Sequence, residues 1–163
     1  MYKTLTIIGT RPEAIKTAIL HKLLLENEKF DPVLLSTGQH KTLLTQALND
    51  FDISEFHQLG DDIPDISVAG KCSIIIGRLD NYISTRKPDL IIVQGDTLSS
   101  FCASLVAYLN KIPLAHIESG LRTGDKWRPF PEEMFRQFND LSADILFAPT
   151  ESARQNLIEE GYK

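Results

Sequence analysis

Short apolar runs alternate with segments of helical period along most of the chain. The first run, residues 5–8, closes with a glycine, and Pro12 follows where a first helical turn tolerates proline. The next segment repeats apolar residues at i, i+4 and i+8, which predicts a helix. The positions of this apolar stripe are Ile15, Ile19 and Leu23.

The same alternation continues to the last residues. Further strands are predicted at residues 33–35, 56–59, 90–93, 113–117 and 145–148. Helices are predicted around residues 43–51, 68–83, 101–109 and 151–160. Pro88 stops the helix that precedes the fourth strand. That strand is wholly apolar and rich in β-branched residues, as expected of a strand buried on both faces.

Strands that alternate with helices after short loops are typical of a parallel sheet with crossover helices. We therefore predict an α/β fold for residues 1–163, a single Rossmann-like domain with a doubly wound parallel sheet. In such folds the ligand crevice lies at the carboxyl ends of the strands. The loops that follow the strands are thus the places to look for chemistry.

Composition narrows the choice of ligand. Apolar residues make up 42% and charged residues 24% of the chain, as in folded globular proteins. The net charge of −5 supplies no general basic field, so neither nucleic acid nor a membrane surface is an expected partner. Cys72 and Cys102 have no metal-ligand or disulfide spacing, and no signal segment opens the chain, so a reducing cytoplasm is expected.

The first loop, residues 9–16, is basic and opens a helix. It matches neither the dinucleotide fingerprint nor the P-loop. The amides at the start of the helix attract anions, and Arg11 and Lys16 add two positive charges, so a diphosphate would be held well there. The alternative is that both side chains are solvated surface cations.

Carboxylates follow the later strands. Asp96 ends the loop after residues 90–93, where an acid could simply cap the next helix. His116 and Glu118 end another strand two residues apart, on one face, but the cysteine pair of zinc deaminases is absent and no metal is expected. Glu132 stands at a helix start, where one acid is ordinary dipole complementarity. Three such acids beside two cations favour a functional site.

Several motifs together give the chain a family resemblance. They are residues 9–16, 38–40, 95–97, 116–124, 131–133 with Arg136, and 149–151. In this order they resemble the N-terminal domain of the non-hydrolysing UDP-N-acetylglucosamine 2-epimerases, bacterial enzymes that interconvert UDP-N-acetylglucosamine and UDP-N-acetylmannosamine. The resemblance implies one half of a glycosyltransferase-B-like pair of Rossmann domains, a cleft between the halves as active site, and a homodimer formed through this domain.

Site residues carry over by position. The resemblance implies that Arg11 and Lys16 bind the UDP-sugar substrate and that Asp96, Glu118 and Glu132 are catalytic, with no cofactor and no metal. A histidine that the family uses belongs to the second domain. A second UDP-N-acetylglucosamine activates some relatives through a Gln-His pair, so Gln39 and His40 are candidate regulatory residues.

Two positions depart from the family pattern. Gln94 stands where the family has His before Gly-Asp-Thr, and Phe135 stands where it has Asn before the Arg. Both changes affect the expected positioning of neighbouring carboxylates.

The chemistry fits the residue types. The hydrogen on C2 of a hexosamine is not next to a carbonyl, so a carboxylate can remove it effectively only if UDP leaves C1 in the same elimination. Re-addition of UDP with protonation on the other face then inverts C2. Such a site needs a base, an acid and cations for the diphosphate. The sequence leaves open which carboxylate serves which face.

Two other functions remain as alternatives. One is an epimerase for a related UDP-diacetamido sugar, although Glu13 in the first motif and the long loop 123–130 favour N-acetylglucosamine. The other is a non-catalytic module that folds and at most binds a ligand weakly. Because half of the interdomain site is expected elsewhere, we expect the 163-residue chain to fold without epimerising.

Overall fold

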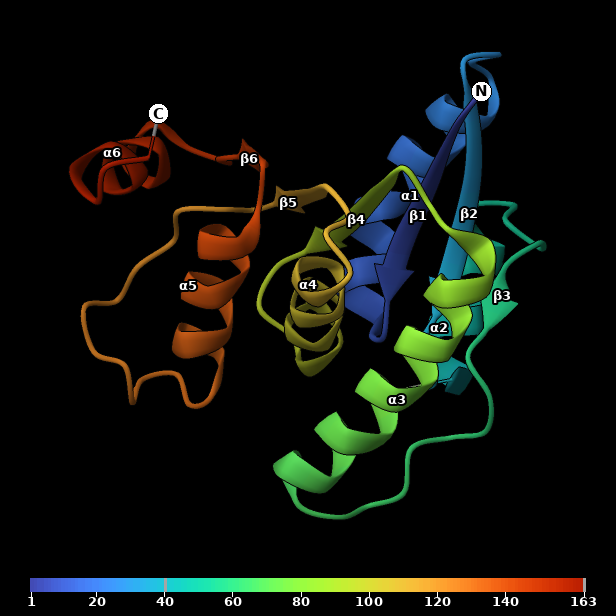
Figure 1. The fold of residues 1–163 in the computed structure, drawn as a ribbon, viewed down its shortest axis with the longest axis horizontal. Coiled ribbons are helices and arrows are strands. Elements are labelled where there is room, and N and C mark those ends of the chain that lie inside the picture. The colour runs from blue at the N-terminus through green and yellow to red at the C-terminus, as the bar shows by residue number, and fades with distance from the viewer. Residues whose placement is uncertain (40, 163) are drawn as a thin grey trace.

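A twisted parallel sheet forms the centre of the molecule (Figure 1). The computed structural model describes residues 1–39 and 41–162. Their strands are β1 (Tyr2–Ile8), β2 (Phe30–Ser36), β3 (His57–Gln58), β4 (Leu90–Gln94), β5 (Leu114–Ile117) and β6 (Ile145–Phe147). Every neighbouring pair is parallel, and the spatial order is β3-β2-β1-β4-β5-β6. This is the order of the doubly wound Rossmann fold, so the predicted fold class is confirmed.

Helices cover both faces of the sheet. They are α1 (Arg11–Leu25), α2 (Lys41–Asp50), α3 (Val68–Arg86), α4 (Leu98–Leu109), α5 (Glu132–Ser142) and α6 (Glu151–Glu159). One apolar core lies between the sheet and α1 with α2, and a larger one lies between the sheet and α3 with α4. The chain changes face between β1 and β4, and the crevice between their carboxyl ends is the switch point of the fold.

Most predicted elements lie where the pattern placed them, and their ends have local causes. Lys87 adopts a left-handed conformation with φ 47° and ends α3 just before Pro88, as predicted. The strand predicted at residues 56–59 shrinks to His57–Gln58, because only two of its residues pair with β2. Within β4, Ile91–Val93 are buried, which confirms a strand covered on both faces.

The apolar stripe of α1 was predicted from its period, but the stripe faces solvent. Ile15, Ile19 and Leu23 are 41%, 56% and 58% exposed. The buried positions are Glu13, Ala14, Thr17, Ala18 and His21. Small side chains on this face let α1 lie close to β1 and β2, so close approach at the switch point takes precedence over burial of the larger side chains.

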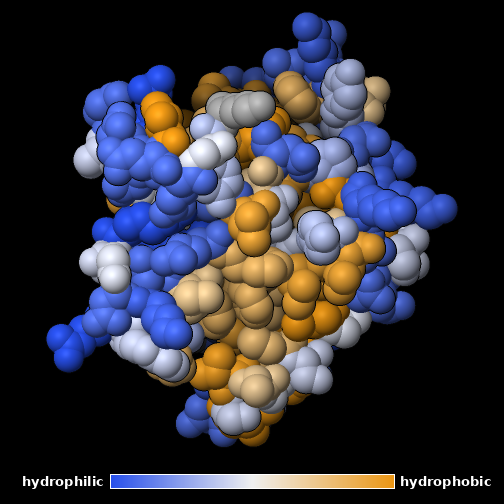
Figure 2. Space-filling view, turned by 60° about the vertical axis from the view of Figure 1, so that its left-hand side comes forward, coloured by the Kyte–Doolittle hydropathy of each residue, from blue (hydrophilic) through white to orange (hydrophobic). Residues whose placement is uncertain are grey.

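Exposed apolar residues also gather elsewhere. Figure 2 brings the side of α5 and α6 forward and shows a continuous apolar area bordered by hydrophilic residues. Elements of that side carry exposed apolar side chains, among them Leu141 of α5 and Phe147 of β6. Among the residues that the structure describes, no helix is long and apolar enough to cross a membrane.

Both cysteines are free thiols in the layer of α3 and α4. Cys102 is fully buried, as expected of a small apolar residue, whereas Cys72 is only partly buried. Burial, together with the neighbouring Cys72, raises the pKa of the Cys102 thiol, so this thiol is kept protonated and inert.

Candidate functional site

The turn from β1 into α1 is held by a buried carboxylate. One oxygen of Glu13 accepts hydrogen bonds from the backbone N–H groups of Gly9 (2.9 Å) and Thr10 (2.7 Å) and from the Thr10 hydroxyl (2.8 Å). Burial raises the pKa of Glu13, although these hydrogen bonds oppose the shift. Gly9 is required by close approach, because a Cβ there would lie 1.9 Å from the Ser99 hydroxyl oxygen.

The two basic residues of the first loop differ in their surroundings. Arg11 is the first residue of α1 and is exposed. Within residues 1–39 and 41–162 no hydrogen bond or ion pair engages its guanidinium. Lys16 lies one turn further along and its Nζ is 2.6 Å from Oε2 of Glu118. The structure therefore links only Lys16 directly to a predicted catalytic acid.

Asp96 lies between β4 and α4 but does not cap the helix. Thr97 is the N-cap, and its hydroxyl accepts a hydrogen bond from the backbone N–H of Ser100 (3.1 Å). The carboxylate of Asp96 instead forms an ion pair with Arg136 of α5. The capping interpretation of Asp96 is therefore wrong, and its side chain is left for interactions across the crevice.

Glu118 and His116, which were expected on one face, have different side-chain partners. Strand β5 ends at Ile117, and Glu118 adopts a left-handed conformation with φ 71°. Its carboxylate accepts hydrogen bonds from Lys16 and from the side-chain amide of Gln94. Thus Gln94, the departure from the family pattern, is a direct partner of a candidate catalytic residue.

The two acids at the start of α5 have different environments. Glu133 is fully buried, accepts a hydrogen bond from the backbone N–H of Thr123 (3.1 Å), and lies 3.3 Å from Nη1 of Arg136. Glu132 is only partly buried and lines a cavity. Arg136 joins Glu133 to Asp96, so one arginine connects α5 with the loop after β4.

That cavity, of about 460 Å³, lies along the carboxyl ends of β1 and β4. Its lining residues include Asp96, Glu132, Phe135 and Gln39. Phe135, the second departure from the family pattern, stacks on Phe101 with ring centroids 4.6 Å apart. The predicted site residues thus fall into two neighbouring groups. Asp96, Glu132 and Gln39 line the cavity, whereas its lining does not include Arg11, Lys16 or Glu118.

Gln39 belongs to the group that lines the cavity. Its Oε1 accepts a hydrogen bond from the Ser99 hydroxyl (2.8 Å), and it lines the same cavity as Asp96 and Glu132. His40, its predicted regulatory partner, lies outside the described residues.

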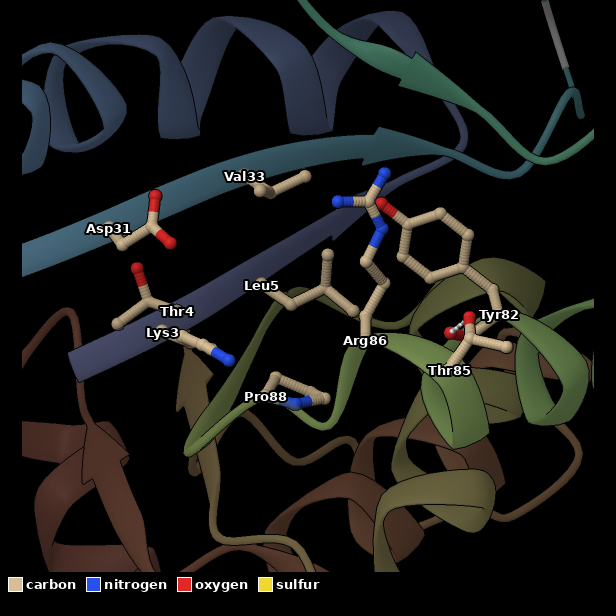
Figure 3. Close-up of a pocket in the computed structure, with 9 residues that line it drawn as sticks. All are labelled: Lys3, Thr4, Leu5, Asp31, Val33, Tyr82, Thr85, Arg86 and Pro88. Carbon is tan, nitrogen blue, oxygen red and sulfur yellow. Dashed lines mark hydrogen bonds between the residues drawn. The ribbon is translucent and has the colours of Figure 1, made fainter. Parts of the chain in front are cut away.

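A second cavity, of about 330 Å³, lies at the amino ends of the strands (Figure 3). Arg86, Tyr82 and Thr85 at the end of α3 face Leu5 and Val33 of the sheet there. The Arg86 guanidinium lies over the Tyr82 ring, 5.6 Å from its centroid. Ligands of this fold bind at the opposite ends of the strands, and none of the predicted site residues lies here.

Two buried residues that support the candidate site, Glu13 and His116, were not predicted as such from the sequence. Glu13 was noted only as part of a motif. Its burial was not predicted, because a charged residue in the first turn of a helix is usually exposed. His116 is fully buried and lies 2.6 Å from Asp140 and 2.8 Å from the Gly95 carbonyl oxygen. In the part of the chain that is described, no group of three or more His, Cys, Asp or Glu side chains could hold a metal ion.

A doubly wound parallel sheet with cations and carboxylates around its switch point defines a Rossmann-like α/β domain with a candidate ligand site. The family described as UDP-N-acetylglucosamine 2-epimerase matches residues 22–163, and the chain belongs to this family.

Named relatives match the chain along nearly all of its length. The UDP-N-acetylglucosamine 2-epimerase of Bacillus subtilis is 41% identical over 161 residues, which are 99% of this chain and 42% of the relative. That of Yersinia pestis is 42% identical over 163 residues, and the match covers 97% of this chain and 42% of the relative. The chain thus spans less than half the length of these relatives.

Solved structures agree with this assignment. The Neisseria meningitidis epimerase bound to UDP-GlcNAc superposes with a TM-score of 0.94 at 38% identity, over 99% of this chain and 44% of that one. MurG of Acinetobacter baumannii has a TM-score of 0.68 at 14% identity, over 93% of this chain and 43% of its own, and shows a shared fold alone.

Proposed function

We propose that this chain forms one wall of the active site of an enzyme that interconverts UDP-N-acetylglucosamine and UDP-N-acetylmannosamine. The observation that carries the proposal is a crevice with Asp96 and Glu132 in its lining, in a chain of the epimerase family. Solved relatives are described with UDP-GlcNAc bound, and in one case with UDP-GlcNAc and UDP. The other wall belongs to a second domain, in line with the share of each relative that this chain matches.

The proposed reaction is an elimination followed by re-addition. A carboxylate takes the proton from C2, the C1–O bond breaks, and UDP leaves with the bonding electron pair, so that a C1–C2 double bond forms. UDP then adds back to C1, and an acid on the opposite face returns a proton to C2. The intermediate is 2-acetamidoglucal, and no oxidant or cofactor is needed.

The residues divide these tasks. Arg11, at the exposed start of α1, and Lys16 supply positive charge for the leaving diphosphate, next to the amides of the helix start. Asp96, Glu118 and Glu132 supply the proton-transfer groups. Arg136 and Lys16 hold two of these carboxylates through ion pairs, which fixes their direction before substrate arrives.

A chimera tests the proposal in a complete enzyme. In it, residues 1–163 replace the matching part of the Bacillus subtilis relative, which is 41% identical. The chimera is assayed in deuterium oxide by proton NMR, starting from UDP-N-acetylglucosamine. Elimination requires exchange at C2, so both sugars should acquire deuterium there as UDP-N-acetylmannosamine forms.

Inversion without deuterium uptake would overturn the elimination. A chimera that unfolds cooperatively but does not epimerise would overturn the assignment of this chain. The 163-residue chain alone serves as the matched control, since it lacks the second wall and is expected to fold and to form no UDP-N-acetylmannosamine at an enzymatic rate.

The same proposal includes a homodimer formed through this domain. The exposed stripe of Ile15, Ile19 and Leu23 on α1 offers an apolar surface for a second copy. Sedimentation velocity at rising concentration should show a dimer that Ile19→Asp abolishes. Ser84→Asp, on the surface of α3, is the control and should leave the dimer intact. A monomer at all concentrations would contradict the homodimer without affecting the proposed reaction.

A further inference from the structure

His116 is a buried titratable group that the proposed reaction does not use. It lies on β5 with no exposed surface. Its Nδ1 is 2.6 Å from Oδ1 of Asp140, and its Nε2 is 2.8 Å from the carbonyl oxygen of Gly95. Both ring nitrogens therefore face oxygen atoms at hydrogen-bond distance.

These two contacts determine where the protons are. A carbonyl oxygen has no hydrogen to give, so Nε2 must donate to Gly95. Asp140 accepts through Oδ2 from the backbone N–H of Gly120 (3.0 Å) and from Nη1 of Arg122 (2.7 Å), an arrangement that suits a carboxylate. An ionised Asp140 has no hydrogen for Nδ1 either, so Nδ1 must donate as well.

We propose that both ring nitrogens of His116 carry a proton in the fold and that His116 acts as the positioning residue for the loop that carries Asp96. Its positive charge is balanced within the same buried network, since Arg122 also pairs with Glu160 at the end of α6. The network thus contains two cations and two anions.

The ionised state of Asp140 belongs to the same network of contacts. Burial opposes ionisation of Asp140. The hydrogen bond and charge of His116, with the hydrogen bonds from Arg122 and Gly120, overcome it and lower the pKa of this carboxyl. Tyr162 is the other titratable group near the network, and burial together with Asp140 and Glu160 raises the pKa of its phenol, which stays neutral.

The network reaches the loops that carry two of the three candidate catalytic acids, Asp96 and Glu118. Gly95 has φ 70°, and its carbonyl oxygen accepts hydrogen bonds from His116 and from the side-chain amide of Asn139 (3.1 Å). Gly95 immediately precedes Asp96. Asp140 also holds the Gly120 amide, two residues beyond Glu118. A single buried ion pair therefore fixes the backbone of the loops after β4 and β5.

The first test needs no enzyme activity. The 163-residue chain, labelled with ¹⁵N-histidine, is studied by long-range proton–nitrogen NMR at neutral pH. The chain has four histidines, and His116→Gln identifies the signal of interest by its loss. Both nitrogens of His116 should show the shifts of an imidazolium. His21 is the internal reference for a neutral ring, because burial lowers the pKa of His21.

One unprotonated ring nitrogen in His116 at neutral pH would overturn the imidazolium. In Asp140→Asn the counter-charge is gone, so the signal should change to that of a neutral ring. The matched control is Asp144→Asn, since Asp144 accepts from the backbone N–H of Leu114 at the other end of β5 and does not touch His116. An imidazolium that persists in Asp140→Asn would show that Asp140 does not hold the proton.

The second test rests on the proposed function and uses the chimera. For Asp140→Asn we expect kcat to fall about 10–100-fold with KM changed less than about threefold, as for residues that orient catalytic groups. Asp144→Asn should leave both unchanged. An unchanged kcat in a folded Asp140→Asn chimera would overturn the positioning role. An inactive parent chimera would refute the proposed function and leave the NMR result standing.

Discussion

Glu13 of α1 accepts a hydrogen bond from the hydroxyl of Thr97, the residue that caps α4, at 2.6 Å. The contact spans the switch point, because α1 follows β1 and α4 follows β4. One carboxylate thus holds the backbone of the first loop and the cap of the helix opposite. The crevice is preorganised by a residue that does not itself line it.

Replacing Glu13 should therefore weaken the fold itself. Glu13→Ala leaves the buried amides of Gly9 and Thr10 without an acceptor. Each unsatisfied buried donor costs roughly 1–3 kcal/mol, so for the two donors a loss of about 2–6 kcal/mol in the free energy of unfolding is expected. Glu13→Gln keeps an acceptor and should lose less. Urea denaturation of the 163-residue chain measures both, with Glu28→Ala, an exposed change just beyond α1, as the control. Equal losses in Glu13→Ala and Glu28→Ala would contradict this role.

The same residue gives the protein a pH dependence of known sign. The folded pKa of Glu13 is raised, so its folded state binds the proton more tightly than the unfolded chain. The stability linked to this proton is fully present below the unfolded pKa and is lost as pH rises through the folded pKa. Relative to Glu13→Gln, the natural chain should gain stability as pH falls from about 8 to about 5. A constant difference would show that burial does not perturb this group.

The architecture could be predicted from sequence because its signals are local. Apolar runs with short turns gave the six strands, and Pro88 gave the end of α3. The face of α1 could not be predicted, because apolar period alone does not reveal that small residues are needed at the sheet. We expect Ala18→Leu to cost roughly 1–3 kcal/mol through overpacking. Leu25→Ser, at an exposed position of the same helix outside the Ile15, Ile19 and Leu23 stripe, should change stability by less than about 0.5 kcal/mol, as for surface positions.

The candidate site could be predicted only in part for the same reason. Asp96 and Glu132 were found because each stands at the end of a recognisable element, and the structure places both at one cavity. The connection from His116 to Asp140 joins residues 24 positions apart and has no periodic signal. The turn at Glu118 depends on a left-handed conformation, which a glutamate in the sequence does not predict. Nonlocal contacts of this kind appear only in the fold.

Arg11 and Lys16 should contribute to anion binding and little to stability. In the chimera, replacing either by Ala should weaken UDP binding by roughly 1–3 kcal/mol, the scale of a lost charge-assisted hydrogen bond. The Lys16 ion pair is 49% exposed on the lysine side, and such pairs add little stability. The melting temperature should therefore hardly move.

Titration calorimetry with UDP measures these affinities. Lys22→Ala is the matched control, because Lys22 lies on the same helix near its other end. Unchanged affinity in both loop variants would favour solvated surface cations.

Asp96, Glu118 and Glu132 should behave as proton-transfer groups and not as helix-starting acids. Changes to Asn or Gln keep the shape of each side chain and remove its ability to take a proton, so we expect kcat of the chimera to fall about a hundredfold or more. Glu151→Gln is the matched control, since Glu151 stands in the first turn of α6 and pairs only with nearby Arg154. A helix-start role alone predicts equally small effects for Glu132→Gln and Glu151→Gln. Variants slowed in re-addition should also release free UDP and 2-acetamidoglucal, which proton NMR resolves. Near-normal turnover in all three would refute the site while the fold and family stand.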